Sequence, residues 1–281
     1  MPDLGFLLKV SRPRFWFYLF GPYIVGLAAG ASDTSELVTW QTAFFALYFL
    51  FPANLLIYGI NDIFDHETDN FNEKKVEYET LVERENHRNL IFGILALNLP
   101  FLIPAVIFMP ELLAALAAFL FFSVFYSAPP IRAKSIPLVD SAFNVLYVFP
   151  GVVGYQLLSG AWPPPSVIVA AGLWTAAMHA YSAIPDIGAD NLAGVRTIAT
   201  LCGPYLTLAI CAALYAAAAV LSIPYLGFVS VPLGSAYVLL MLASVWSYRS
   251  GRLFKLYRAF PIINVAAGFI LFWEVAMSKF F

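Results

Sequence analysis

Charged residues are scarce in this sequence. Asp, Glu, Lys and Arg make up only 11% of the 281 residues, whereas they make up about one-quarter of a typical soluble domain. Hydrophobic residues make up 61%. This composition excludes an ordinary soluble domain and indicates a chain that lies largely in lipid. The formal net charge of −2 says little in such a chain. We expect no nucleic-acid partner.

Cysteine is equally scarce. The chain has two, Cys202 and Cys211, and both fall in or near one apolar run. Their spacing is not that of a metal site, and two residues cannot form a disulfide scaffold. We interpret them as small apolar packing residues.

Long apolar runs are the main feature that the sequence does contain. Each is about 17–25 residues long, enough to cross a bilayer as a helix. We identify nine, at residues 14–31, 40–62, 89–109, 111–128, 138–159, 166–187, 203–222, 228–247 and 260–279. The shorter runs are also compatible with re-entrant segments. The sequence therefore predicts an all-α fold, a polytopic bundle of about nine transmembrane helices in a single domain over residues 1–281.

The basic residues favour one orientation. If the N-terminus is cytoplasmic, only Lys279 falls on the opposite side. The cytoplasmic segments then hold Lys9, Arg12, Arg14, Lys74, Lys75, Arg84, Arg88, Arg132, Lys134, Arg196, Arg249, Arg252, Lys255 and Arg258. Because cytoplasmic loops of membrane proteins are enriched in Lys and Arg, we expect an integral membrane protein of the cell membrane with a cytoplasmic N-terminus.

The first acidic motif ends the second apolar run. Its polar positions are Asn61, Asp62, Asp65 and Asp69, and spacings of three and four residues place the aspartates on one face of a helix. Carboxylates this close repel one another unless a cation lies between them. Mg²⁺ is a hard ion that prefers oxygen ligands and binds phosphates. The alternative is a solvated helix end.

A second acidic pair follows the sixth apolar run. Asp186 and Asp190 are separated by one helical turn and fall on the same predicted side of the membrane as the first motif. We therefore expect both motifs, and the active site, at the cytoplasmic face.

Basic residues accompany these motifs. Arg132 and Lys134 follow the Pro129–Pro130 pair, which ends a helix and stiffens the turn. Such a fixed pair suits a diphosphate, because Arg makes planar bidentate contacts and Lys supplies a point charge. Arg12 is a third candidate phosphate ligand. Simple anchoring to lipid headgroups is the alternative for all three.

Polar and aromatic side chains in the apolar runs are candidates for the substrate cavity, because such residues usually face a cavity or a partner. Aromatic faces also stabilise cations. The candidates are Asn54, Tyr58, Tyr126, Asn144, Tyr147 and Tyr181. Residues 70–88 form the longest hydrophilic stretch, which is either a lid over the site or a solvated connector.

These parts together suit a lipid diphosphate. The carboxylates would hold Mg²⁺, the basic residues would neutralise a departing diphosphate, and the apolar bundle would hold an isoprenoid tail. An allylic diphosphate has both ends, and loss of its diphosphate leaves a cation that a lipophilic acceptor can attack.

The motifs resemble those of the UbiA superfamily of intramembrane prenyltransferases over nearly the whole chain. The resemblance implies an all-α bundle around a central cavity open near the cytoplasmic face. By motif match it implies a catalytic metal and diphosphate site at Asn61, Asp62, Asp65, Asp69, Asp186 and Asp190, with diphosphate contacts from Arg132 and Lys134.

The stretches Tyr181–Asp190 and Ala193–Thr197 most resemble the lycopene elongase branch. That resemblance implies transfer of a C5 unit from dimethylallyl diphosphate to lycopene or a related linear carotenoid, sometimes with hydration. Aromatic quinone or chlorin precursors and glycerol-phosphate lipids are alternative acceptors. A cation-coupled transporter is a remote alternative, since its carboxylates are expected near the membrane midplane. The oligomeric state is left open.

Overall fold

The regular structure is helical throughout the part of the chain that the structure describes. A computed structural model describes residues 3–69 and 82–281, and of residues 66–69 it describes the backbone alone. The longer helices are α2 (Phe17–Gly30), α3 (Trp40–Leu50), α4 (Pro52–Asp69), α6 (His87–Phe108), α7 (Leu113–Ser127), α9 (Phe149–Ser159), α10 (Pro165–Ala183), α12 (Ile198–Leu226), α13 (Ser230–Arg249) and α14 (Leu253–Phe280). Three short helices are α1 (Leu4–Val10), α8 (Val139–Ala142) and α11 (Ile187–Leu192).

Seven stretches of the described residues are long and apolar enough to cross a membrane. One of them, Ile198–Arg249, contains both α12 and α13. The predicted span 14–31 corresponds to α2, whose 14 residues extend about 21 Å, less than the ~30 Å hydrocarbon core. With α12 and α13 separated and α2 included, the bundle agrees with the prediction of about nine helices. The predicted all-α membrane fold is confirmed.

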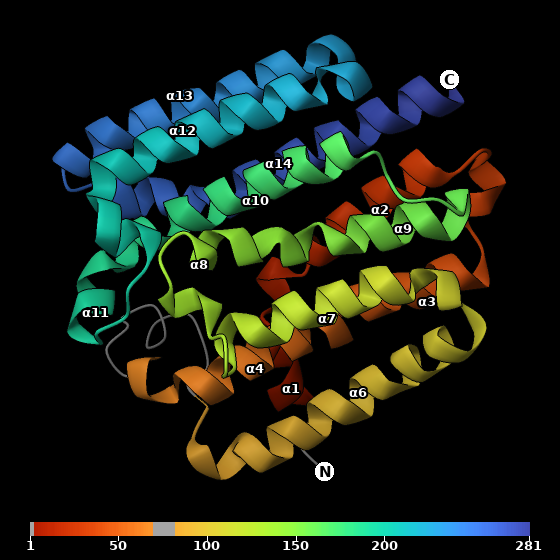
Figure 1. Cartoon of the computed structure of the whole chain (residues 1–281), viewed down its shortest axis with the longest axis horizontal. Coiled ribbons are helices and arrows are strands. Elements are labelled where there is room, and N and C mark those ends of the chain that lie inside the picture. Colours follow the sequence, from red (N-terminus) through yellow and green to blue (C-terminus); the bar gives the residue numbers. More distant parts are fainter. Residues whose placement is uncertain (1–2, 70–81) are drawn as a thin grey trace.

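The long helices lie side by side along the long axis of the molecule, and their connections gather at its two ends (Figure 1). The C-terminal end of α4, α11 and the turn between α13 and α14 lie at one end. The connections from α2 to α3 and from α9 to α10 lie at the other, with the C-terminus. Both acidic motifs therefore lie at the same end of the bundle.

Glycines let α2 and α9 approach closely. A Cβ added at Gly26 of α2 would collide with the backbone of Gly151 in α9, and one at Gly154 would collide with the backbone of Tyr23. Small residues at such contacts are typical of membrane helices, where packing replaces the hydrophobic effect. This contact brings the first turn of α2 beside the segment that precedes α9, so that the rings of Tyr18 and Tyr147 lie 6.0 Å apart.

A break between α3 and α4 sets the direction of the motif helix. Pro52 has no N–H to continue the helix, and Phe51 leaves helical geometry with φ −125° and ψ −61°. The Asn54 side chain donates to the freed carbonyls of Phe49 and Leu50, at 2.8 Å and 3.1 Å. Asn98 of α6 donates to the carbonyl of Pro52 at 3.0 Å. Buried amide side chains thus satisfy backbone groups that the kink would leave unpaired.

Candidate active site

Two buried carboxylates end α4. Asp62 and Asp65 are each only 3% exposed, and an isolated carboxylate buried to that extent is costly. Each has a basic partner from a distant segment. Arg12 donates to Oδ1 of Asp62 at 2.7 Å, and Nζ of Lys134 pairs with Oδ1 of Asp65. The first acidic motif and two of the predicted phosphate ligands therefore meet.

Arg12 is fixed by more than its ion pair. Its guanidinium carbon lies 4.7 Å from the centroid of the Tyr58 ring, a cation–π geometry. Its backbone has φ +51°, in the left-handed region that non-glycine residues seldom adopt. The basic group is thereby held between a carboxylate and an aromatic face.

Arg132 shares this unusual backbone. Its φ is +46°, and its guanidinium nitrogen lies 4.0 Å from Oδ1 of Asp65. Left-handed geometry at a non-glycine residue costs about 1–3 kcal/mol and often marks functional sites. Two of the three predicted phosphate ligands carry that cost, and each of the two faces a motif carboxylate.

Asn61 links the motif to α7. Its Nδ2 donates to Oδ2 of Asp65 at 2.6 Å and to Oγ of Ser127 at 3.1 Å. Sequence reasoning did not select Ser127. Its position beside Asn61 depends on a contact between residues 66 positions apart, which no local pattern indicates.

The second motif flanks the same region. Asp186 ends the short 3₁₀ segment Ile184–Asp186, and Asp190 lies in α11. Both are half-buried, and Oδ2 of Asp190 accepts a hydrogen bond from Thr197 at 3.5 Å. α11 and the end of α4 also share one end of the bundle in Figure 1.

A central cavity of about 130 Å³ adjoins these groups. Three predicted substrate residues line it, namely Tyr58, Asn144 and Tyr147, and Arg12 packs over the ring of Tyr58. The full lining is Phe15, Tyr18, Tyr58, Asn144, Tyr147, Met178, His179, Ser182, Tyr257, Phe260 and Pro261. A charged end and an aromatic chamber thus lie next to one another.

Comparison with known proteins assigns this arrangement to a family. The model of the UbiA prenyltransferase family matches residues 19–273. The chain belongs to the UbiA prenyltransferase family.

Relatives of this UbiA member are carotenoid enzymes by name. A lycopene elongase/hydratase of Haloferax volcanii is 39% identical over 274 residues, which is 95% of this chain and 87% of that protein. Another from Haloarcula japonica is 43% identical over 201 residues, covering 71% of this chain and 68% of that protein. A UbiA homologue of Archaeoglobus fulgidus, solved with DMAPP and Mg²⁺, has the same fold, with a TM-score of 0.68 at 20% identity over 95% of this chain and 98% of that one.

The residues of this UbiA chain suit a hard divalent ion, although the described side chains do not assemble the whole predicted ligand set. Within the described residues, no three His, Cys, Asp or Glu form a group that could hold a metal. The side chain of Asp69 and the predicted lid residues 70–81 lie outside the described residues. Asn61, Asp62 and Asp65 supply oxygen donors beside basic groups, and this is the donor type that Mg²⁺ prefers when it binds with phosphate.

Two predicted substrate residues lie away from the cavity lining. Asn54 is fully buried and bonded to the α3–α4 kink. The Tyr181 hydroxyl accepts from Ser244 at 3.0 Å, and its ring packs 4.7 Å from that of Phe260. These placements favour structural roles for both. Tyr126 lies behind the lining, with its ring 5.8 Å from that of His179.

Several lining residues were not predicted, among them Tyr18, His179, Ser182 and Tyr257. The available signal was polarity within an apolar run, since such residues usually face a cavity or a partner.

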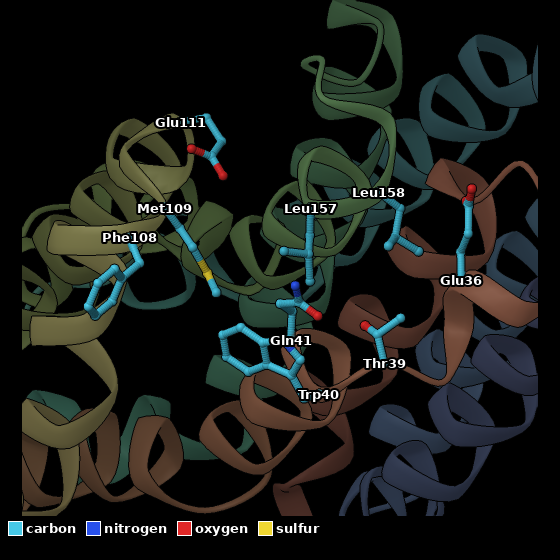
Figure 2. A pocket seen from close by; sticks show the side chains of 9 residues that line it. All are labelled: Glu36, Thr39, Trp40, Gln41, Phe108, Met109, Glu111, Leu157 and Leu158. Atoms are coloured by element: carbon cyan, nitrogen blue, oxygen red, sulfur yellow. The ribbon is translucent and has the colours of Figure 1, made fainter.

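A larger cavity, of about 690 Å³, opens at the opposite end of the helices. Its lining comes from the start of α3, the α6–α7 junction and the end of α9, with Glu36 and Glu111 on opposite sides (Figure 2). None of its lining residues belongs to the acidic motifs or the basic loop. Because it has two carboxylates and no basic side chain in its lining, it does not suit a diphosphate.

Proposed function

We propose that this UbiA enzyme transfers a five-carbon prenyl group from dimethylallyl diphosphate to lycopene or a related linear carotenoid, with Mg²⁺ as cofactor. The observation that carries the proposal is the pairing of buried Asp62 and Asp65 with Arg12 and Lys134 directly beside an aromatic cavity. The 39% identity to a lycopene elongase/hydratase supports the choice of donor and acceptor.

The diphosphate end is assigned to the charged residues. Arg12, Arg132 and Lys134 would bind the diphosphate oxygens, since guanidinium and ammonium groups bind phosphate strongly. Asp62 and Asp65, with Asn61, Asp69, Asp186 and Asp190, would hold the metal. Bound Mg²⁺ would neutralise the charge that develops on the leaving diphosphate.

The hydrocarbon end is assigned to the cavity. Tyr18, Tyr58 and Tyr147 present aromatic rings there, and such faces stabilise an allylic cation after diphosphate leaves. A carbon–carbon double bond of the acceptor then attacks that cation. We further propose that the N-terminus and this site face the cytoplasm, because the basic loops lie at the same end of the molecule as the site.

The test is product formation by the purified enzyme in lipid nanodiscs. Labelled dimethylallyl diphosphate and Mg²⁺ are supplied with lycopene, an aromatic quinone precursor or a glycerol-phosphate lipid. The proposal expects label in a prenylated carotenoid and little in the other acceptors. Preferential labelling of either other acceptor would overturn the choice of acceptor while leaving prenyl transfer in place.

A further inference from the structure

A buried Asp–His pair lies beside the central cavity, outside the acidic motifs. Asp140 of α8 is fully buried and the His179 side chain of α10 is 15% exposed, with Nε2 3.7 Å from Oδ2 of Asp140. His179 lines the cavity. Among the described residues, its buried Nε2 has no hydrogen-bond partner. A polar pair inside a membrane bundle is expensive and usually functional.

Asp140 is held rigidly. Its Oδ2 accepts from the backbone N–H of Ile198, the first residue of α12, at 2.8 Å. The N-terminus of a long helix stabilises negative charge. The Asn144 side chain donates to the backbone carbonyl of Asp140 at 2.8 Å. The carboxylate is therefore fixed on one side of the imidazole.

The imidazole is also held from another direction. The Tyr126 ring meets it edge-on, at 85° and 5.8 Å between centroids. With Nε2 facing Asp140, Nδ1 is the nitrogen left to take a proton from a molecule in the cavity. The carboxylate lies 3.7 Å from Nε2, longer than a hydrogen bond but within ion-pair range, and a histidine beside a buried carboxylate can act as a general base.

The proposed reaction needs such a base. When the acceptor double bond attacks the allylic cation, its electron pair forms the new C–C bond and leaves a tertiary cation on the acceptor. That cation becomes neutral by losing a proton from a neighbouring carbon, or by capturing water, which then loses a proton. Either course releases one proton. Of the residue types in the described cavity lining, histidine is the one that accepts a proton near neutral pH.

We propose that His179 is the catalytic base that accepts this final proton, and that Asp140 is the positioning residue that orients the imidazole and stabilises its charged form. The inference rests on the proposed function. The C–H or water O–H bond breaks, its electron pair forms the new C=C bond or remains on the alcohol oxygen, and the proton goes to Nδ1. Ser182 and Asn144 lie in the same lining, so the site also has polar groups for a water molecule.

The test separates donor ionisation from product completion. The full-length enzyme in nanodiscs receives Mg²⁺, dimethylallyl diphosphate and lycopene, and both diphosphate and prenylated carotenoid are measured. In His179→Gln, diphosphate release should persist, while carotenoid formed per diphosphate should fall at least about tenfold, the lower range of general-base effects. An acceptor cation that cannot lose its proton reverts by breaking the new C–C bond, and water then captures the allylic cation, so the difference should appear as dimethylallyl alcohol. Asp140→Asn should lower the same ratio less.

Chemical rescue gives the control. Added imidazole should raise the ratio for His179→Ala but not for Met178→Ala, which enlarges the same cavity without removing a base. Labelled water distinguishes the two courses, because only water capture places its oxygen in the product.

Each possible result either supports or overturns the assignment of His179. A folded His179→Gln enzyme with wild-type donor affinity and an unchanged product ratio overturns the assignment, and His179→Asn gives the same decision if the Gln variant does not fold. A wild-type enzyme that prenylates no carotenoid overturns the proposed function, and the assignment of His179 with it.

Discussion

At the scale of single residues, the site is a set of compensated charges. Asp62 and Asp65 are buried near the C-terminal end of α4, and Arg12 and Lys134 reach them from segments far away in sequence. A buried carboxylate is retained at a cost only where it is paired. In the proposed function the same carboxylates would hold the metal, and the same basic groups would bind the diphosphate.

Replacing Asp65 tests whether its negative charge, which is paired with Lys134, is needed for prenyl transfer. Asp65→Asn keeps the side-chain shape and removes the negative charge, so prenyl transfer should fall by at least about a hundredfold, the size of an electrostatic contribution to a leaving group. Labelled prenyl transfer is the measurement. Glu111→Gln, a carboxylate of the cavity at the opposite end, is the matched control and should keep the wild-type rate. Equal rates for both variants would contradict the assignment.

The Asn54 side chain hydrogen-bonds to backbone carbonyls at the break between α3 and α4. Asn54→Ala leaves the carbonyls of Phe49 and Leu50 without their donor, so the free energy of unfolding should fall by about 1–3 kcal/mol. Thermal unfolding in detergent measures this. The KM for the allylic diphosphate should not change.

An amide in the cavity provides the contrast. Asn144→Ala, at a lining position, should alter acceptor choice. If Asn54→Ala instead raised the KM for the allylic diphosphate and left the free energy of unfolding unchanged, Asn54 would belong to the substrate site.

At the scale of elements, the close contact between α2 and α9 lies beside the cavity, since Tyr18 and Tyr147 next to it are both lining residues. Gly26→Ala places a methyl group against the backbone of Gly151, and overpacking of this kind costs about 1–3 kcal/mol. The melting temperature and the prenyl-transfer rate should both fall. Gly21→Ala, on the same helix with nothing within 4 Å of the added atom, should be neutral or slightly stabilising. Identical melting temperatures for the two variants would contradict the packing account.

The sequence predicted the membrane-spanning helices and part of the candidate site. Hydropathy identified the spans because segments that cross the hydrocarbon core need long apolar runs, and motif spacing placed Asp62 and Asp65 on one helix. The left-handed backbone of Arg12 and Arg132 could not be predicted from the sequence, because tertiary contacts impose it. The pairing of Asp140 with His179 likewise joins α8 to α10 and has no local signature.

At the scale of the whole molecule, a cytoplasmic active site requires one orientation of the bundle in the membrane. In a background without Cys202 and Cys211, a Ser250→Cys variant at the α13–α14 turn should react with an impermeant maleimide only in inside-out vesicles. Ser159→Cys at the end of α9 should react only in right-side-out vesicles. Both serines are exposed and lie at opposite ends of the bundle. The reverse labelling pattern would contradict a cytoplasmic active site.

The most direct measurement of the central claim is an experimental structure with Mg²⁺ and a non-hydrolysable thio-analogue of dimethylallyl diphosphate. We predict that the diphosphate lies between the two acidic motifs, in contact with Arg12 and Lys134, and that the prenyl group lies against Tyr58 and Tyr147. A diphosphate bound in the Glu36–Glu111 cavity, or remote from either acidic motif, would contradict it.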